Sequence, residues 1–114
     1  MHLKDVKIDD GALQFLAPLS HLEDLSLAIN KITDKGVTSL LPLKNLKHLN
    51  LTDTKVTVAC ADTLAKLPSL TELRISHLDF SREQVAQIQR KLPRCKIIDG
   101  RKTGTDMSIF NPLH

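Results

Sequence analysis

The chain has 114 residues, the size of one domain and too short for two that fold independently. With 41% hydrophobic and 25% charged residues it is neither disordered nor fibrous, and three Phe with no Tyr or Trp leave Leu, Ile and Val to fill the core. A formal net charge of +3 is modest and does not by itself indicate nucleic-acid binding.

Apolar residues recur with a period of 24 residues, which is typical of a solenoid. Four equivalent positions are apolar in each of three consecutive repeats: Leu22, Leu25, Leu27 and Ile32; Leu46, Leu49, Leu51 and Val56; Leu70, Leu73, Ile75 and Phe80. A shift back by the same period places Leu3 and Ile8 at these positions. A shift forward that allows one inserted residue aligns 92–98 with 67–73 and predicts that a closing strand begins there.

Each unit changes its periodicity halfway. Segments such as 25–27 alternate apolar and polar residues, as a strand with one covered face does, whereas segments such as 82–88 space apolar residues three or four apart, as a short helix does. Thr33 and Ser81 are expected to cap the starts of their helices. Prolines stand where the helices must end: Pro42, Pro68 and Pro93.

The pattern L-x-x-L-x-L-x-x-N-x-I over residues 22–32 resembles the leucine-rich repeat, and the resemblance extends over about residues 1–100. The stretches 32–37 and 51–57 are similar to bacterial repeats of this family. The family's asparagine column is kept only at Asn30. The resemblance implies an α/β leucine-rich repeat solenoid, a short right-handed parallel β/α horseshoe of about four repeats, which binds a protein partner of unknown identity across its concave face.

The two ends of the chain differ from the repeats. Residues 1–100 are assigned to the leucine-rich repeat domain and 101–114 to an irregular C-terminal cap or tail, either docked over the last repeat or disordered. No N-terminal cap is recognisable, so the strand expected near 2–4 should leave one sheet edge unpaired. Such an edge invites a homo-oligomer, and self-association or docking through it is the alternative to recognition on the concave face.

In this family the residues that flank the strand leucines point to the concave surface, so the alternation names candidate contact residues. Those for protein binding are Asp24, Ser26, His48, Asn50, Thr52, Glu72, Arg74 and Ser76. The column Asp24, His48, Glu72 should form a carboxylate, imidazole, carboxylate ladder on strands about 4.8 Å apart. A fourth column of the same grid contains Ile29 and Asp53.

The sequence gives little support for catalysis or metal binding. The ladder offers one histidine for a metal, and no concave pocket is expected that would shift its pKa values. His77 beside Asp53 suggests a general base, but no activated nucleophile or G-x-S-x-G motif accompanies it. Cys95 stands in an apolar column, which favours a buried thiol over a reactive one. We therefore expect no enzyme, no cofactor and no metal.

Charge and hydropathy set the remaining expectations. Residues 82–102 carry seven basic and two acidic residues, which we interpret as a solvated surface; without an aromatic for base stacking, nucleic acid is not an expected partner. No segment reaches the ~20 apolar residues that span a bilayer, and the first residues lack the apolar centre of a secretory signal. Two cysteines without paired spacing agree with a reducing compartment, so we expect a cytoplasmic protein without membrane contact.

Overall fold

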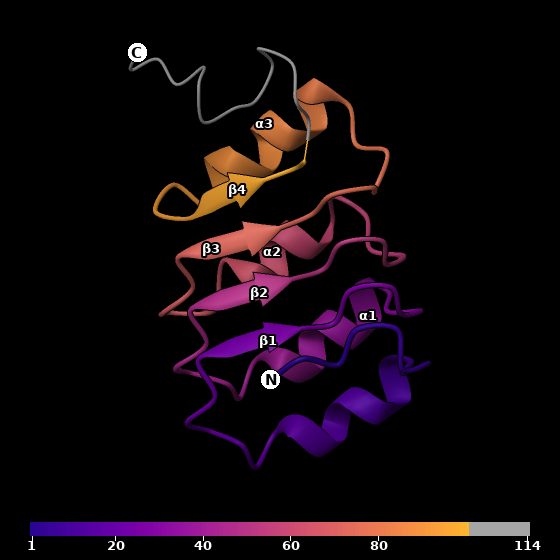
Figure 1. The fold of residues 1–114 in the computed structure, drawn as a ribbon. Helices are drawn as coiled ribbons and strands as arrows, with labels where there is room; N and C mark the ends of the chain where they lie inside the picture. The colour runs from indigo at the N-terminus through magenta and orange to yellow at the C-terminus, as the bar shows by residue number, and fades with distance from the viewer. Residues whose placement is uncertain (101–114) are drawn as a thin grey trace.

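The computed structural model describes residues 1–100, and the expectations for 101–114 lie outside the described residues. Four short parallel strands pair in chain order into one sheet, with helices behind it and the other face open (Figure 1). The strands are β1 (Asp24–Ser26), β2 (His48–Asn50), β3 (Glu72–Arg74) and β4 (Lys96–Ile98). The predicted strand-helix solenoid and the presence of a closing strand are confirmed. The predicted register of that strand is wrong by one residue, because Ile97 rather than Ile98 pairs with Leu73.

The strand register reproduces the 24-residue period. Leu25 pairs with Leu49, Leu49 with Leu73, and Leu73 with Ile97, so one leucine column runs through the centre of the sheet. These side chains are at most 4% exposed, and they face the helices. Burial of this aliphatic face against the helices stabilises the stack, at roughly 25 cal/mol per Å² of apolar surface removed from water.

The N-terminal segment extends the sheet beyond β1. The Leu3 amide donates to the Ser26 carbonyl at 2.9 Å, and the Ser26 amide donates to the Met1 carbonyl at 2.9 Å. One isolated bridge, His2 with Ser26, is regular enough to count as β pairing. The strand expected near 2–4 is thus present as an irregular row beside β1.

Short helices cover the other face of the sheet. They are η1 (Asp10–Leu16), α1 (Asp34–Val37) continuing into η2 (Thr38–Leu40), α2 (Cys60–Leu64) and α3 (Arg82–Lys91). Thr33 caps α1 by accepting from the Lys35 amide, and Ser81 and Gln84 form a capping box at α3, so both predicted caps are confirmed. Among residues 1–100, no helix has the length and apolar composition needed to cross a membrane.

Two aspartates join consecutive repeats on the helical side. The Asp10 carboxylate accepts from the backbone amide of Thr33 at 2.8 Å and from its hydroxyl, and the Asp34 carboxylate accepts from the same two groups of Thr57 at 2.8 and 2.5 Å. Gly36 makes room for the first of these links, because a Cβ there would lie 2.1 Å from Asp10 Oδ1. Each link fixes the start of one helix to the unit before it.

Side chains also hold the turns that leave the strands. Asn30, only 6% exposed, donates to the Leu3 carbonyl at 2.7 Å and accepts from the Ile8 amide at 3.0 Å, and so joins two repeats. Where the asparagine is lost in the next repeat, the Thr54 hydroxyl donates to the Leu51 carbonyl at 2.8 Å. A hydroxyl therefore fills part of the role of the missing amide.

The same turns contain a column of left-handed residues. Asp5, Ile29, Asp53 and His77, each 24 residues apart, have φ angles between 53° and 60°. The grid predicted from the alternation includes this column, but the chain has already turned away from the strand direction at these positions. Their side chains therefore belong to the turns at the strand ends, not to the open face of the sheet.

Candidate functional site

The polar side chains of the strands gather around a shallow hollow on the open face, a feature that the periodicity does not predict. The hollow has a volume of about 240 Å³. Six of the eight predicted contact residues line it: Asp24, Ser26, His48, Asn50, Glu72 and Arg74. We call these six residues the open-face cluster. The strand register brings them together, because residues 24 apart become lateral neighbours.

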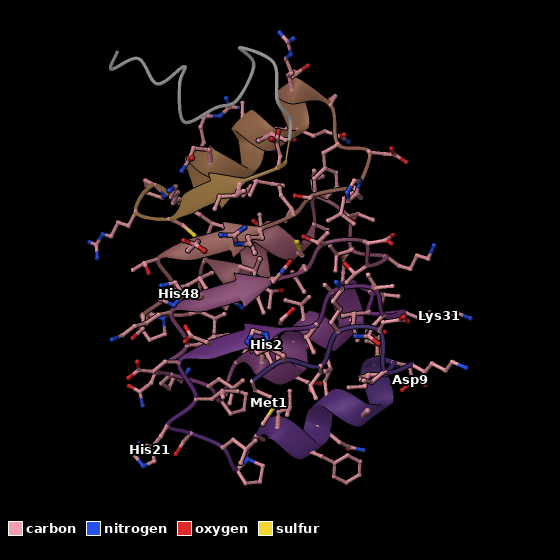
Figure 2. All side chains as sticks on the ribbon, viewed as in Figure 1. Met1, His2, Asp9, His21, Lys31 and His48 are labelled. Atoms are coloured by element: carbon pink, nitrogen blue, oxygen red, sulfur yellow. The ribbon has the colours of Figure 1, made fainter. Side chains whose placement is uncertain are left out.

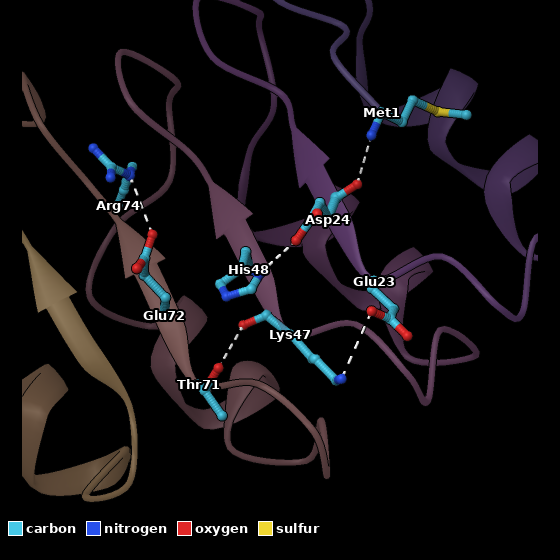
Figure 3. A network of polar contacts seen from close by, with 8 residues as sticks. All are labelled: Met1, Glu23, Asp24, Lys47, His48, Thr71, Glu72 and Arg74. Carbon is cyan, nitrogen blue, oxygen red and sulfur yellow. Dashed lines mark hydrogen bonds and ion pairs between the residues drawn. The ribbon is translucent and has the colours of Figure 1, made fainter.

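Asp24 and His48 form the first contact across the strands. The His48 Nδ1 atom meets the Asp24 Oδ1 atom, and the Asp24 backbone carbonyl accepts from the Met1 ammonium group at 2.8 Å (Figure 3). The two side chains are 50% and 64% exposed. A polar contact this exposed adds little stability, so both groups are available to a partner.

The predicted ladder of three residues is paired only in its first half. Glu72 lies in register with His48, but its carboxylate contacts the Arg74 Nε atom on the same strand at 3.3 Å instead (Figure 3). Arg74 is half exposed and Glu72 about one quarter. The face therefore presents the Arg74 guanidinium beside the Glu72 carboxylate, rather than a continuous row of three paired side chains.

The centre of the cluster contains a side-chain amide. Asn50 is partly buried, and its Oδ1 atom accepts from the Thr52 backbone amide at 3.0 Å. Its Nδ2 group has no hydrogen-bond partner among residues 1–100 and can donate outward. Ser26, in contrast, is 9% exposed, which leaves little of it to contact a ligand.

Thr52 and Ser76 stand apart from the hollow. Thr52 is partly buried just beyond β2. Ser76 lies against Gly100, where an added Cβ would come within 2.5 Å of the Ser76 hydroxyl oxygen. Met1 and His2 line the hollow as well, and the pairing of His2 with Ser26 follows from the same 24-residue register. That register is the signal that places His2 in the site.

The arrangement does not provide an activated nucleophile in the described part of the chain. Burial raises the pKa of the Cys60 thiol to about 12, with a further contribution from the Asp34 carboxylate. Burial likewise raises the pKa of Cys95 to about 11, with Glu72 adding to it. Both thiols are buried, as predicted for Cys95, and stay protonated at neutral pH.

The other candidate chemistry has no support in residues 1–100. No hydrogen bond or ion pair joins Asp53 to His77, which occupy consecutive turns. No group of three or more His, Cys, Asp or Glu residues in this range is arranged to hold a metal ion. What the site can do is present hydrogen-bond donors, acceptors and one guanidinium on an accessible surface.

The fold and this surface define a short parallel α/β solenoid that presents an open polar face. A family model for the leucine rich repeat matches residues 20–80, more than half of the chain, and the protein belongs to this family. A comparison with curated proteins finds no match. Domains of this family generally mediate protein-protein interactions and are non-enzymatic modules.

Proposed function

We propose that the chain is a non-enzymatic recognition module that binds a protein partner with its open, concave face. The observation that carries the proposal is the convergence of the open-face cluster on one hollow. These side chains come from three different strands, and the paired backbones of those strands fix their spacing. A preformed set of polar groups on a rigid sheet lowers the ordering cost of binding.

The chemistry of the face indicates what a partner must offer. The side chains of His48, Asn50 and Arg74 can donate hydrogen bonds, and each is half exposed or lies at the surface of the hollow. A complementary partner surface therefore presents carbonyl or carboxylate oxygens. Asp24 and Glu72 flank these donors and accept from a cationic or amide group on the partner. Such alternation contributes more to specificity than to affinity.

The test is capture from a lysate with the 114-residue chain, with the retained proteins identified by mass spectrometry. A variant with His48, Asn50 and Arg74 replaced by Ala should lose a protein that the wild type retains. The matched control replaces three exposed residues on the helical side by Ala: Lys66, Gln87 and Arg90. Retention of that protein by the control supports the proposal. Equal retention by all three chains would show that the open face is not the binding surface.

A second candidate function is self-association through the N-terminal end of the stack. Apolar side chains are exposed there: Phe15 is 73%, Val6 52% and Leu19 40% accessible. In the next repeat the counterpart of Leu19 is Leu43, which is fully buried. Sedimentation over a range of concentrations tests this candidate. A dimer that is lost when Phe15 and Leu19 are both replaced by Ser supports it, and a monomer at every concentration contradicts it.

A further inference from the structure

Basic residues gather in the segments that lead into the strands. The seven residues before each strand are 17–23, 41–47, 65–71 and 89–95. Together these segments carry six basic residues and one acidic residue, Glu23. We call the four segments the basic edge. In Figure 2, His21 and His48 mark this side of the molecule, and Asp9 and Lys31 mark the side where the strands end.

The turns at the other ends of the strands do not share this excess of positive charge. The seven-residue segments that follow the N-terminal row and the first three strands are 3–9, 27–33, 51–57 and 75–81. They carry four lysines and four aspartates. A groove of about 550 Å³ at the C-terminal ends of the strands is lined by three residues of each kind and is formally neutral. An anionic partner is therefore attracted to the basic edge rather than to the opposite turns.

Most cations of the basic edge have no acidic neighbour that neutralises them. Lys47 contacts Glu23 at 3.6 Å, and Lys91 contacts Asp62 at 2.6 Å. The other four basic residues are exposed and form no ion pair within the described residues 1–100: Lys44, Lys66, Arg90 and Arg94. These four charges are available to a partner.

Hydrogen bonds between the turns hold these charges along one line. The Ser69 hydroxyl donates to the Lys44 carbonyl at 2.9 Å and joins the second segment to the third. The Lys96 amide donates to the Thr71 carbonyl at 2.8 Å and joins the third segment to the last strand. The unpaired cations of three consecutive turns therefore follow the axis of the stack.

A groove between the third and fourth segments adds an apolar site to the basic edge. Its volume is about 220 Å³, and its lining contains Lys91 and Arg94 but no acidic residue. Pro68 and Pro93 line it and are exposed. Cys95 occupies the buried position that leucine has in the two preceding repeats, and its smaller side chain leaves space there. The groove can therefore receive one aliphatic side chain beside cationic groups.

We propose that the basic edge binds an acidic segment of a partner protein that places one aliphatic side chain in this groove. Carboxylates next to that side chain pair with Arg94 and with Lys66, which lies between the lining residues Ala65 and Leu67 in the chain. A further carboxylate pairs with Lys44 in the neighbouring turn. The apolar groove favours a protein over a nucleic acid, because the four segments contain no Phe, Tyr or Trp on which bases stack. The edge shares no residue with the open-face cluster, so this interaction goes beyond recognition on that face.

The test is titration of the ¹⁵N-labelled 114-residue chain, followed by NMR, with a synthetic peptide that has one Leu between two runs of Glu and is blocked at both ends. Shifts are expected in the amides of 65–71 and 89–95. A peptide with Ala in place of the Leu should bind about tenfold more weakly. Charge reversal in Arg94→Glu should weaken binding at least about threefold. Lys55→Glu makes the same change of charge at an exposed residue on the opposite side, and this matched control should bind like the wild type.

Several results would overturn this proposal. They are no binding at millimolar peptide, shifts centred on the open-face cluster, equal binding of the Leu and Ala peptides, and equal losses in Arg94→Glu and Lys55→Glu. Tighter binding of a single-stranded oligonucleotide with as many negative charges would assign the edge to nucleic acid instead.

The capture experiment separates the two binding surfaces. A partner held by the basic edge would be lost from the variant in which Lys66, Gln87 and Arg90 are replaced, and it would be kept by the open-face variant. A partner held by the open face shows the opposite pattern. Either proposal can therefore fail while the other stands.

Discussion

Ile29 occupies a backbone conformation that opposes its own side chain. A β-branched residue with a φ of 59° places its Cβ too close to neighbouring backbone atoms. We predict that Ile29→Asn raises the free energy of unfolding by about 1 kcal/mol, because asparagine tolerates the left-handed region. Urea unfolding of the variant and the wild type measures the change.

The control for this prediction is Val6→Asn. Val6 is 52% exposed and is not among the residues with positive φ, so the same loss of an apolar side chain occurs there without relief of strain. An equal gain in both variants would show that the replacement of an exposed apolar side chain by a polar one, rather than the backbone conformation, is responsible. A loss of stability in Ile29→Asn would contradict the strain itself.

The Cys60 thiol connects stability to alkaline pH. Burial raises its folded-state pKa from 9.0 to about 12, so between these values the folded protein keeps the proton that the unfolded chain releases. The contribution of this thiol to the free energy of unfolding is therefore fully present below about pH 9 and decreases as the pH rises through this window. We predict that the free energy of unfolding declines by up to about 1.4 kcal/mol per pH unit from this group.

Comparison of slopes isolates the contribution of this thiol. Urea unfolding at about pH 8 and about pH 10.5 should show a smaller decline in Cys60→Ala than in the wild type. The variant also lacks some packing, but that loss is the same at both pH values and does not affect the slope. Parallel declines in the two proteins would contradict the raised pKa.

At the scale of the elements, the aspartate links decide how firmly one repeat is joined to the next. We predict that Asp34→Ala lowers the free energy of unfolding by about 1–2 kcal/mol, because it removes both hydrogen bonds to Thr57 at the start of the following helical segment. A double-mutant cycle with Thr57→Ala measures the coupling. Additive losses in the double variant would show that the two side chains do not interact in solution.

The third junction of the stack uses a different device. The position equivalent to Asp34 is Val58, which cannot accept a hydrogen bond from Ser81. The Gln84 side chain accepts from the Ser81 amide at 2.9 Å instead, within the capping box of α3. The last helix is thus capped from within its own repeat. This difference agrees with its greater length, since a ten-residue helix contributes more of its own stability.

Several strands and helix starts could be predicted from the sequence, because a single clear pattern marks each of them. Leu49 between polar neighbours predicts a strand, and Ser81 followed by Gln84 predicts a helix start. The extent of the short helices could not be predicted in the same way. Segment 10–16 forms a 3₁₀ helix and α1 has only four residues, because packing between neighbouring units, rather than propensity, fixes such short pieces.

The sequence predicts which residues of the candidate site are lateral neighbours in the sheet, but it does not predict which of their side chains are in contact. The 24-residue period places Glu72 beside His48, yet whether the carboxylate points to His48 or to Arg74 depends on rotamers that a sequence does not specify. The position of the left-handed column was still harder to predict. Alternation assigns Ile29 to the concave grid, and only the left-handed backbone reveals that its side chain belongs to the groove at the strand ends.

On the scale of the whole molecule, the stack exposes surfaces of different chemistry. The open face is polar, a groove at the C-terminal ends of the strands is lined by lysines, aspartates and Ile29, and the N-terminal end exposes Phe15. Each of these surfaces is therefore a separate candidate for contact with a partner protein. The open face remains the central assignment, because three paired strands position its groups.

The most direct test of that assignment is site-specific photo-cross-linking. A photo-reactive amino acid is placed at Asn50, in the centre of the open face, or at Gln87, which is exposed on α3. Each chain is irradiated in a lysate of its source, and the cross-linked proteins are identified. The account predicts a partner cross-linked from position 50 and absent from position 87. A partner cross-linked from position 87 alone would contradict it.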